Sequence, residues 1–96
     1  MNLLAYVRSQ RKELIAIAKK HGAYDLRVFG SVARGEESDK SDIDILVSFE
    51  KGRSLFDEVR LFDELTNHLN HKIDLVGEDS LSPLLKSKIL KEAILI

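Results

Sequence analysis

The sequence predicts an α/β fold in which a small β-sheet is flanked by helices. Two observations carry this prediction. Three short segments, 24–29, 42–49 and 71–76, alternate apolar and polar residues, which is typical of strands. The longer segments around them repeat apolar residues every three or four positions, which is typical of amphipathic helices. Alternating strands and helices indicate an α/β sandwich, and so few strands should leave part of one sheet face open for a site.

The first helix is expected over residues 3–21. Its apolar residues fall near one face, which comprises Leu3, Leu4, Val7, Leu14, Ile15 and Ala18. Gly22 follows, and glycine commonly ends a helix in a left-handed conformation. After the strand over 24–29, the segment 31–34 is long enough for only one helical turn, and 35–41 is a polar loop.

The strand over 42–49 has the clearest alternation, with an apolar face formed by Ile43, Ile45, Val47 and Phe49. Ser54 is expected to cap the next helix, with Asp57 three residues later as its capping-box partner. That helix is predicted to run to Leu69, with an apolar face formed by Leu55, Val59, Phe62 and Leu65.

The carboxyl-terminal third holds the last strand and the last helix. After the strand over 71–76, Ser82-Pro83 predicts a helix start, because serine caps helices and proline fits their first position. This helix carries Leu84, Leu85, Ile89 and Leu90. The apolar residues 93–96 are expected to form a short edge strand or a contact surface.

Size and composition exclude several classes of protein. The 96 residues predict one domain over 1–96, near the lower end of the usual size range. Charges are interleaved with a net charge of −1, so the basic stripe of a general nucleic-acid binder is missing. The sequence contains no cysteine, which excludes disulfides and thiolate zinc sites. It shows neither a secretion signal nor an apolar stretch of roughly 20 residues, so we expect a cytoplasmic protein without a membrane span.

Two aspartates at the start of the central strand predict a metal site. Asp42 and Asp44 are two residues apart, so in a strand they project to the same side about 6.6 Å apart. Two like charges in a partly dry cleft repel one another, and a divalent cation relieves that repulsion. Oxygen-only ligands favour Mg²⁺, with Mn²⁺ as an alternative. Asp74 lies in the next strand and could face the same cleft as a third carboxylate.

The segment before this strand predicts a phosphate site. Gly30 lets the backbone approach a ligand closely, and Ser31 begins a helical turn whose free amides favour phosphate oxygens. Arg34 and Lys40 are the nearest cations. A Gly-Ser turn alone is usually only a turn, and an Asp-x-Asp pair alone is often a solvated strand end. Their joint occurrence predicts a site for a metal-bound nucleoside triphosphate.

The run GSVARG…SDIDILV, with ten residues between Gly30-Ser31 and Asp42-Ile43-Asp44, resembles the minimal nucleotidyltransferase family of the DNA polymerase β superfamily. The later run HKIDLV places Asp74 where that family has its third acid. The resemblance implies a mixed sheet flanked by helices, like the polymerase β palm, and transfer of a nucleoside monophosphate to a hydroxyl. One departure is Val32, because family members often carry a basic residue there.

The resemblance also implies residue roles. Asp42 and Asp44 would hold the catalytic magnesium, and Asp74 would complete the site and help to deprotonate the acceptor. Gly30 and Ser31 would bind the triphosphate, and because Val32 is not basic, further binding would fall to the side chains of Arg34 and Lys40.

The leading hypothesis is therefore an enzyme that transfers AMP from ATP, or another nucleotide, to a partner protein. Many such proteins are antitoxins of a helical HEPN-type toxin, so a partner of that type is implied. Two alternatives stay open: a non-catalytic antitoxin that acts by occlusion, and an adenylyltransferase for a small molecule within a complex. The nucleotide base, the acceptor and a homo-oligomeric state are not fixed by the sequence.

Overall fold

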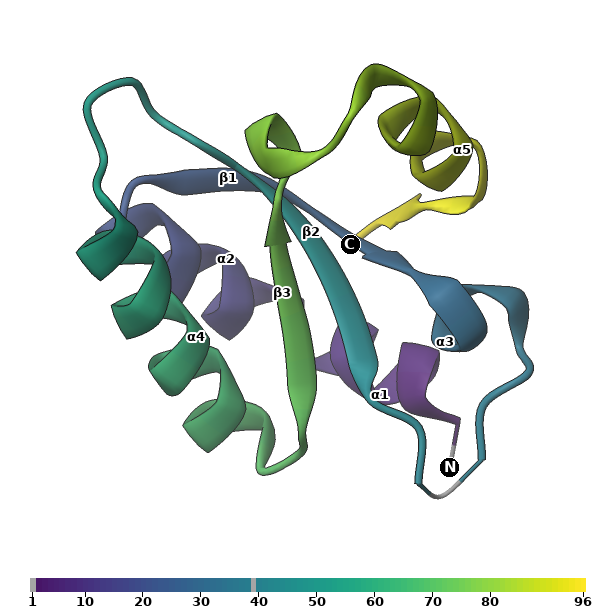
Figure 1. Cartoon of the computed structure of the whole chain (residues 1–96). Coiled ribbons are helices and arrows are strands. Elements are labelled where there is room, and N and C mark those ends of the chain that lie inside the picture. The colour runs from purple at the N-terminus through teal and green to yellow at the C-terminus, as the bar shows by residue number, and fades with distance from the viewer. Residues whose placement is uncertain (1, 39) are drawn as a thin grey trace.

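The computed structural model describes residues 2–38 and 40–96 and shows helices packed on a four-stranded mixed sheet (Figure 1). The strand order is β3-β2-β1-β4. The strands are β1 Ala23–Phe29, β2 Ile43–Phe49, β3 Ile73–Gly77 and β4 Ile94–Leu95. The helices are α1 Leu3–Ser9, α2 Arg11–Lys20, α3 Gly30–Arg34, α4 Leu55–Leu69 and α5 Pro83–Glu92, with a 3₁₀ turn, η1, over Glu78–Ser80. The predicted fold class is confirmed.

Strand β1 lies antiparallel to both β2 and β4, whereas β2 and β3 are parallel. Helices α1, α2 and α4 lie on one face of the sheet, and α3 and α5 lie beside β1 toward the other face (Figure 1). The core fills the space between the sheet and α1, α2 and α4; its buried side chains include Val7, Leu14, Val28, Ile43, Ile45, Leu61 and Leu65. In the part of the chain that the structure describes, none of the helices combines the length and apolar character needed to cross a membrane.

The prediction of one helix over residues 3–21 is wrong, because the segment forms two helices that meet at Gln10. Val7 and Leu14 are both buried, seven residues apart. One continuous helix would carry polar Gln10 or Arg11 on the same buried face between them. The break lets α1 contact α3 while α2 contacts β1 and α4. Ile15, which was expected on the apolar face, is 42% exposed.

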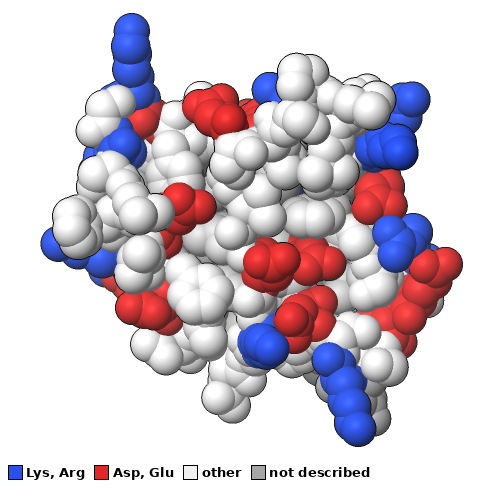
Figure 2. Space-filling model, in the orientation of Figure 1, with Lys and Arg blue, Asp and Glu red and all other residues white. Residues whose placement is uncertain are grey.

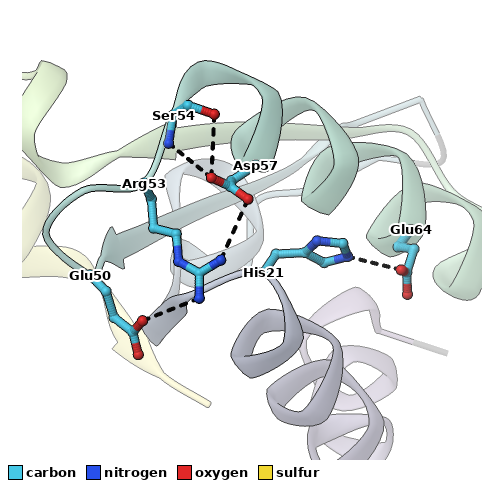
Figure 3. Close-up of polar contacts among 6 residues, drawn as sticks. All are labelled: His21, Glu50, Arg53, Ser54, Asp57 and Glu64. Carbon is cyan, nitrogen blue, oxygen red and sulfur yellow. Dashed lines mark hydrogen bonds and ion pairs between the residues drawn. The ribbon is translucent and has the colours of Figure 1, made fainter.

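Helix α4 begins and ends where the sequence predicts. The Ser54 amide donates to Asp57 Oδ2 at 2.8 Å, which forms the expected capping box (Figure 3). Arg53 adds ion pairs to Glu50 at 3.4 Å and to Asp57 at 3.6 Å. On the neighbouring helix, the His21 ring forms a hydrogen bond with Glu64 at 2.9 Å, which ties α2 to α4 (Figure 3).

The predicted apolar face of α4 is wrong except at Leu65. The buried residues are Leu61, Leu65 and Leu69, whereas Leu55, Val59 and Phe62 are 71%, 49% and 37% exposed. The helix carries two apolar stripes about one residue, or about 100°, apart. Periodicity alone does not decide which stripe meets the sheet.

Apolar side chains also remain exposed on α5, where Leu84, Leu85 and Leu90 are 72%, 47% and 36% exposed. The end of the chain forms an edge strand, which is one of the two structures predicted for residues 93–96. Strand β4 pairs with Arg27 and Val28 of β1, and the amide of buried Ile96 donates to the Leu26 carbonyl at 3.1 Å.

The buried face of α4 can be tested with two leucine substitutions. We expect Leu65→Ala to lower the free energy of unfolding by about 2–5 kcal/mol, because Leu65 is fully buried and its loss leaves a cavity. Leu55→Ala, on the exposed stripe, should change it by less than about 0.5 kcal/mol. Urea denaturation followed by circular dichroism measures both, and equal losses would contradict the observed orientation of the helix.

Candidate active site

Three aspartates lie near the starts of β2 and β3. The parallel register of these strands pairs Asp44 with Asp74, and Asp42 precedes Asp44 by two residues. Because Ile43 and Ile45 point into the core, Asp44 points to the opposite face, and Asp42 lies just before the strand. Figure 2 shows acidic side chains gathered over the middle of this face.

The charges of these aspartates influence one another. Burial raises the pKa of Asp44 above its ordinary value, and the negative charges of Asp74 and Asp42 raise it further, while Arg34 acts in the opposite direction. Asp44 therefore lies near enough to both acids to be repelled by them. This is the electrostatic setting that a cation would relieve.

The donor set suits Mg²⁺ or Mn²⁺, since it consists of carboxylate oxygens. Within residues 2–38 and 40–96, however, no three acidic or histidine side chains are drawn together closely enough to hold a metal as they stand. Asp42 pairs instead with Lys72, whose Nζ lies 3.8 Å from Asp42 Oδ2. This ion pair was not predicted, although Lys72 stands two residues before Asp74 in the sequence.

Gly30 lies directly against Asp44. Its φ of 70° is in the left-handed region, and a Cβ atom added there would lie 2.1 Å from Asp44 Oδ2. The strand register explains this contact, because Phe29 pairs with Asp44 and Gly30 follows Phe29. Ser31 comes next, in the first turn of α3. The predicted phosphate bend and the predicted metal ligands are thus adjacent in space, which the sequence could only infer from their spacing.

Arg34 ends α3 on the same side and is held by two acids. Its Nε donates to Glu36 Oε1 at 2.7 Å, and its Nη1 donates to Glu92 Oε2 at 2.9 Å. Both carboxylates, Glu36 first, raise the pKa of Arg34 above its ordinary value. The other oxygen of Glu92 accepts a hydrogen bond from the Gly30 amide at 3.1 Å. Glu92 was missed by the sequence analysis because it lies 58 residues beyond Arg34 and belongs to no local motif.

Two further residues bear on the predicted site. Lys40 is exposed, and its backbone amide donates to Ser38 Oγ at 3.4 Å. The assignment of Lys40 to the nucleotide stays a prediction. Val32, where a basic residue was expected from the resemblance, is 1% exposed and packs in the core. Its side chain thus serves folding.

Helix α5 is fixed to the same face of the sheet by a second polar cluster. Ser48 lies on the Asp44 side of β2, and its hydroxyl donates to Glu78 Oε2 in η1. Glu78 Oε1 pairs with Lys86 of α5 at 3.0 Å. The hydrogen bond from Ser48, followed by Lys86, lowers the pKa of Glu78. This cluster anchors the middle of α5, whereas Glu92 anchors its end.

Comparison with known proteins gives a consistent result. Residues 12–96 match the family described as "Polymerase beta, Nucleotidyltransferase". A Methanocaldococcus jannaschii protein named "Putative protein adenylyltransferase" is 46% identical over 84 residues, covering 88% of this chain and 90% of that protein. "Protein adenylyltransferase MntA" of Thermococcus cleftensis is 35% identical over 88 residues, covering 92% and 86%.

Solved structures have the same fold. One described as a "putative minimal nucleotidyltransferase" has a TM-score of 0.88 and 44% identity, and the match covers 100% of this chain and 97% of that one. A toxin-antitoxin structure with AMP-PNP has a TM-score of 0.74 at 23% identity, covers 88% and 69%, and shares the fold. The chain therefore belongs to the polymerase beta nucleotidyltransferase family, as its Gly-Ser and Asp-x-Asp motifs predicted.

Proposed function

We propose that this nucleotidyltransferase moves AMP from ATP to a hydroxyl group of a partner protein. The observation that carries the proposal is the contact between Gly30 and Asp44, with Asp74 in register beside them. It places a backbone bend suited to phosphate directly against a pair of carboxylates suited to a cation. Both features are needed to bind a nucleoside triphosphate together with its metal ion.

Each residue of the site would have its own role in the reaction. Asp42, Asp44 and Asp74 would hold Mg²⁺, which when bound neutralises charge on the phosphate oxygens. The amides at Gly30 and Ser31 and the guanidinium of Arg34 would bind the β- and γ-phosphates. Asp74 would accept the proton of the attacking hydroxyl. A new bond from that oxygen to the α-phosphorus then forms as pyrophosphate leaves.

A protein acceptor is supported by the relatives and by the surface of the chain. Relatives at 46% and 35% identity are named as protein adenylyltransferases, and a toxin-antitoxin structure shares the fold. Apolar side chains are exposed on α4, including Leu55 and Phe56, and separately on α5, including Leu84, and each helix is a candidate contact for a partner. Docking would orient the attacking hydroxyl, which is a large part of catalysis in two-substrate reactions. We propose a HEPN-type toxin as this partner and an antitoxin role for the chain.

The activity is tested by incubating the protein with Mg²⁺, ATP labelled at the α-phosphate and the partner that co-purifies with it. We expect label on the partner, and Asp44→Asn should reduce the rate at least about 10²-fold, as losing one preorganised electrostatic contact does. Asp79→Asn is the matched control, because Asp79 is an exposed acid in η1. No transfer by the native protein, or equal transfer by Asp44→Asn, would contradict the proposal.

The same substitution should stabilise the fold. The pKa of Asp44 is raised on folding, so the charge of Asp44 opposes folding once the pH rises through that pKa. Without divalent cations at pH 7, we expect Asp44→Asn to melt roughly 1–4 °C above the native protein. The difference should vanish at a pH well below about 3.9, the ordinary aspartate pKa, where the carboxyl is protonated in both states. A melting temperature well below the native one at pH 7 would instead indicate a structural role for Asp44.

Gly30→Ala tests whether the bend must contact Asp44, and Gly35→Ala is a close control. Both glycines have a φ near 70°, at 70° and 71°, but a Cβ at Gly35 would meet no atom within 4 Å. Each change should cost about 1 kcal/mol of stability for the left-handed conformation. Only Gly30→Ala should also displace the Asp44 carboxylate and lower the rate of AMP transfer, by at least about tenfold. Equal rates for the two variants would show that the contact is unimportant.

A further inference from the structure

One carboxylate holds two of the three groups that the proposed function assigns to the triphosphate. Glu92 Oε1 accepts from the Gly30 amide at 3.1 Å, and Glu92 Oε2 accepts from Arg34 Nη1 at 2.9 Å. The two donors come from the two ends of α3, whereas Glu92 comes from the end of α5. Glu92 therefore supplies a negative charge from the protein itself at the bend that is proposed to bind phosphate.

A carboxylate that bridges a backbone amide and a guanidinium uses the donors that would otherwise hold a phosphate group. The two anions cannot accept from the same N–H groups at once. They also repel each other through their charges at short range. The Gly30 amide has a single N–H, so a phosphate oxygen that accepts from it must displace Glu92, whereas Arg34 has five N–H donors, of which Glu36 and Glu92 each accept from one.

We propose that Glu92 occupies the phosphate-binding donors of the free protein and is displaced by the nucleoside triphosphate, so that this residue sets nucleotide affinity. The inference rests on the proposed function, since it takes Gly30 and Arg34 as triphosphate ligands. It adds a residue that neither the motifs nor the family resemblance pointed to.

The surroundings of Glu92 indicate that its side chain can leave while its backbone stays. The following strand, β4, remains paired with β1 through Ile94 and Val28, and the middle of α5 is held by the Lys86–Glu78 pair. The Glu92 side chain is 31% exposed, so solvent is within reach. Displacement then requires a change of side-chain rotamer and the loss of two hydrogen bonds, and α5 need not unfold.

A purely structural clamp would behave in the opposite way toward nucleotide. If Glu92 only held the bend and Arg34 in place, removing its charge would weaken both folding and nucleotide binding. If Glu92 competes with phosphate, removing its charge weakens the fold slightly and strengthens nucleotide binding. The sign of the change in affinity therefore separates the two roles.

The test is calorimetric titration with Mg²⁺ and an ATP analogue that carries a methylene group between its α- and β-phosphates. We expect Glu92→Gln to lower the Kd about threefold to fivefold, the upper part of the range for loss of one partly exposed charge. Glu36→Gln is the matched control, because Glu36 pairs with Arg34 at 2.7 Å without contacting Gly30 in the described structure. It should change the Kd less than about twofold.

Titration with AMP adds a second control, because AMP lacks the β- and γ-phosphates. Glu92→Gln should leave the Kd for AMP within about twofold of the native value. Thermal melts without nucleotide should place Glu92→Gln at or slightly below the native protein. If Glu92→Gln does not fold, Glu92→Asp replaces it; its shorter side chain cannot bridge both donors, so it should also bind the analogue more tightly.

The outcomes separate this inference from the proposed function. If the native protein transfers AMP but Glu92→Gln binds the analogue equally or more weakly, the inference is wrong and the function stands. An equal gain for Glu36→Gln would also overturn it, since the effect would then come from any charge near Arg34. If neither the native protein nor Glu92→Gln binds the analogue, both the proposed function and the inference fall.

Discussion

The structure depends on one pairing, the parallel register of β2 and β3 that sets Asp44 beside Asp74. This pairing costs stability, because burial and like charge act together on Asp44. The pairing is stabilised by apolar side chains on the other face of the same strands, where Ile43, Ile45 and Ile73 are almost completely buried. The same strand therefore stabilises the fold through its buried apolar face and destabilises it through the charges on its other face. The apolar face fixes the position of acids that would otherwise move apart.

The phosphate bend follows from the same sheet. Strand β1 pairs with β2 so that Phe29 is opposite Asp44, and the chain turns at Gly30 immediately afterwards. Strand β4 then adds to the far side of β1, which brings the end of α5 back to the bend. The site is thus assembled from both halves of the chain, with Glu92 as the contribution of the second half.

Much of this arrangement could be predicted from the sequence. Residue-level alternation identified the strands, capping chemistry at Ser54 fixed the start of α4, and the spacing of Gly30 and Asp44 indicated one site. The failures have physical causes. Helix α4 carries two apolar stripes, and local periodicity cannot choose between them without knowing the sheet that it packs on.

For the same reason, contacts that depend on tertiary structure could not be predicted from local sequence. The break at Gln10 reflects the different partners of α1 and α2. The carboxylate of Glu92 meets Gly30 only because β4 closes the sheet. The assignment of Lys40 to the nucleotide relied on nearness in sequence and stays a prediction. Residues distant along the chain enter a site through topology, which a single segment does not encode.

Gly30 and Gly35, at the ends of α3, both have left-handed backbone conformations. This affects which residues of such a site can change in sequence. Because the backbone at both ends is set by conformations that glycine tolerates best, the direction of the short helix is decided by its boundaries. Of the side chains in between, Val32 and Ala33 pack in or against the core, so Ser31 and Arg34 are the ones open to substitution. Substitution of Ser31 or Arg34 can change the charge and hydrogen bonding at the bend while Asp44 and Asp74 keep their paired positions in the sheet.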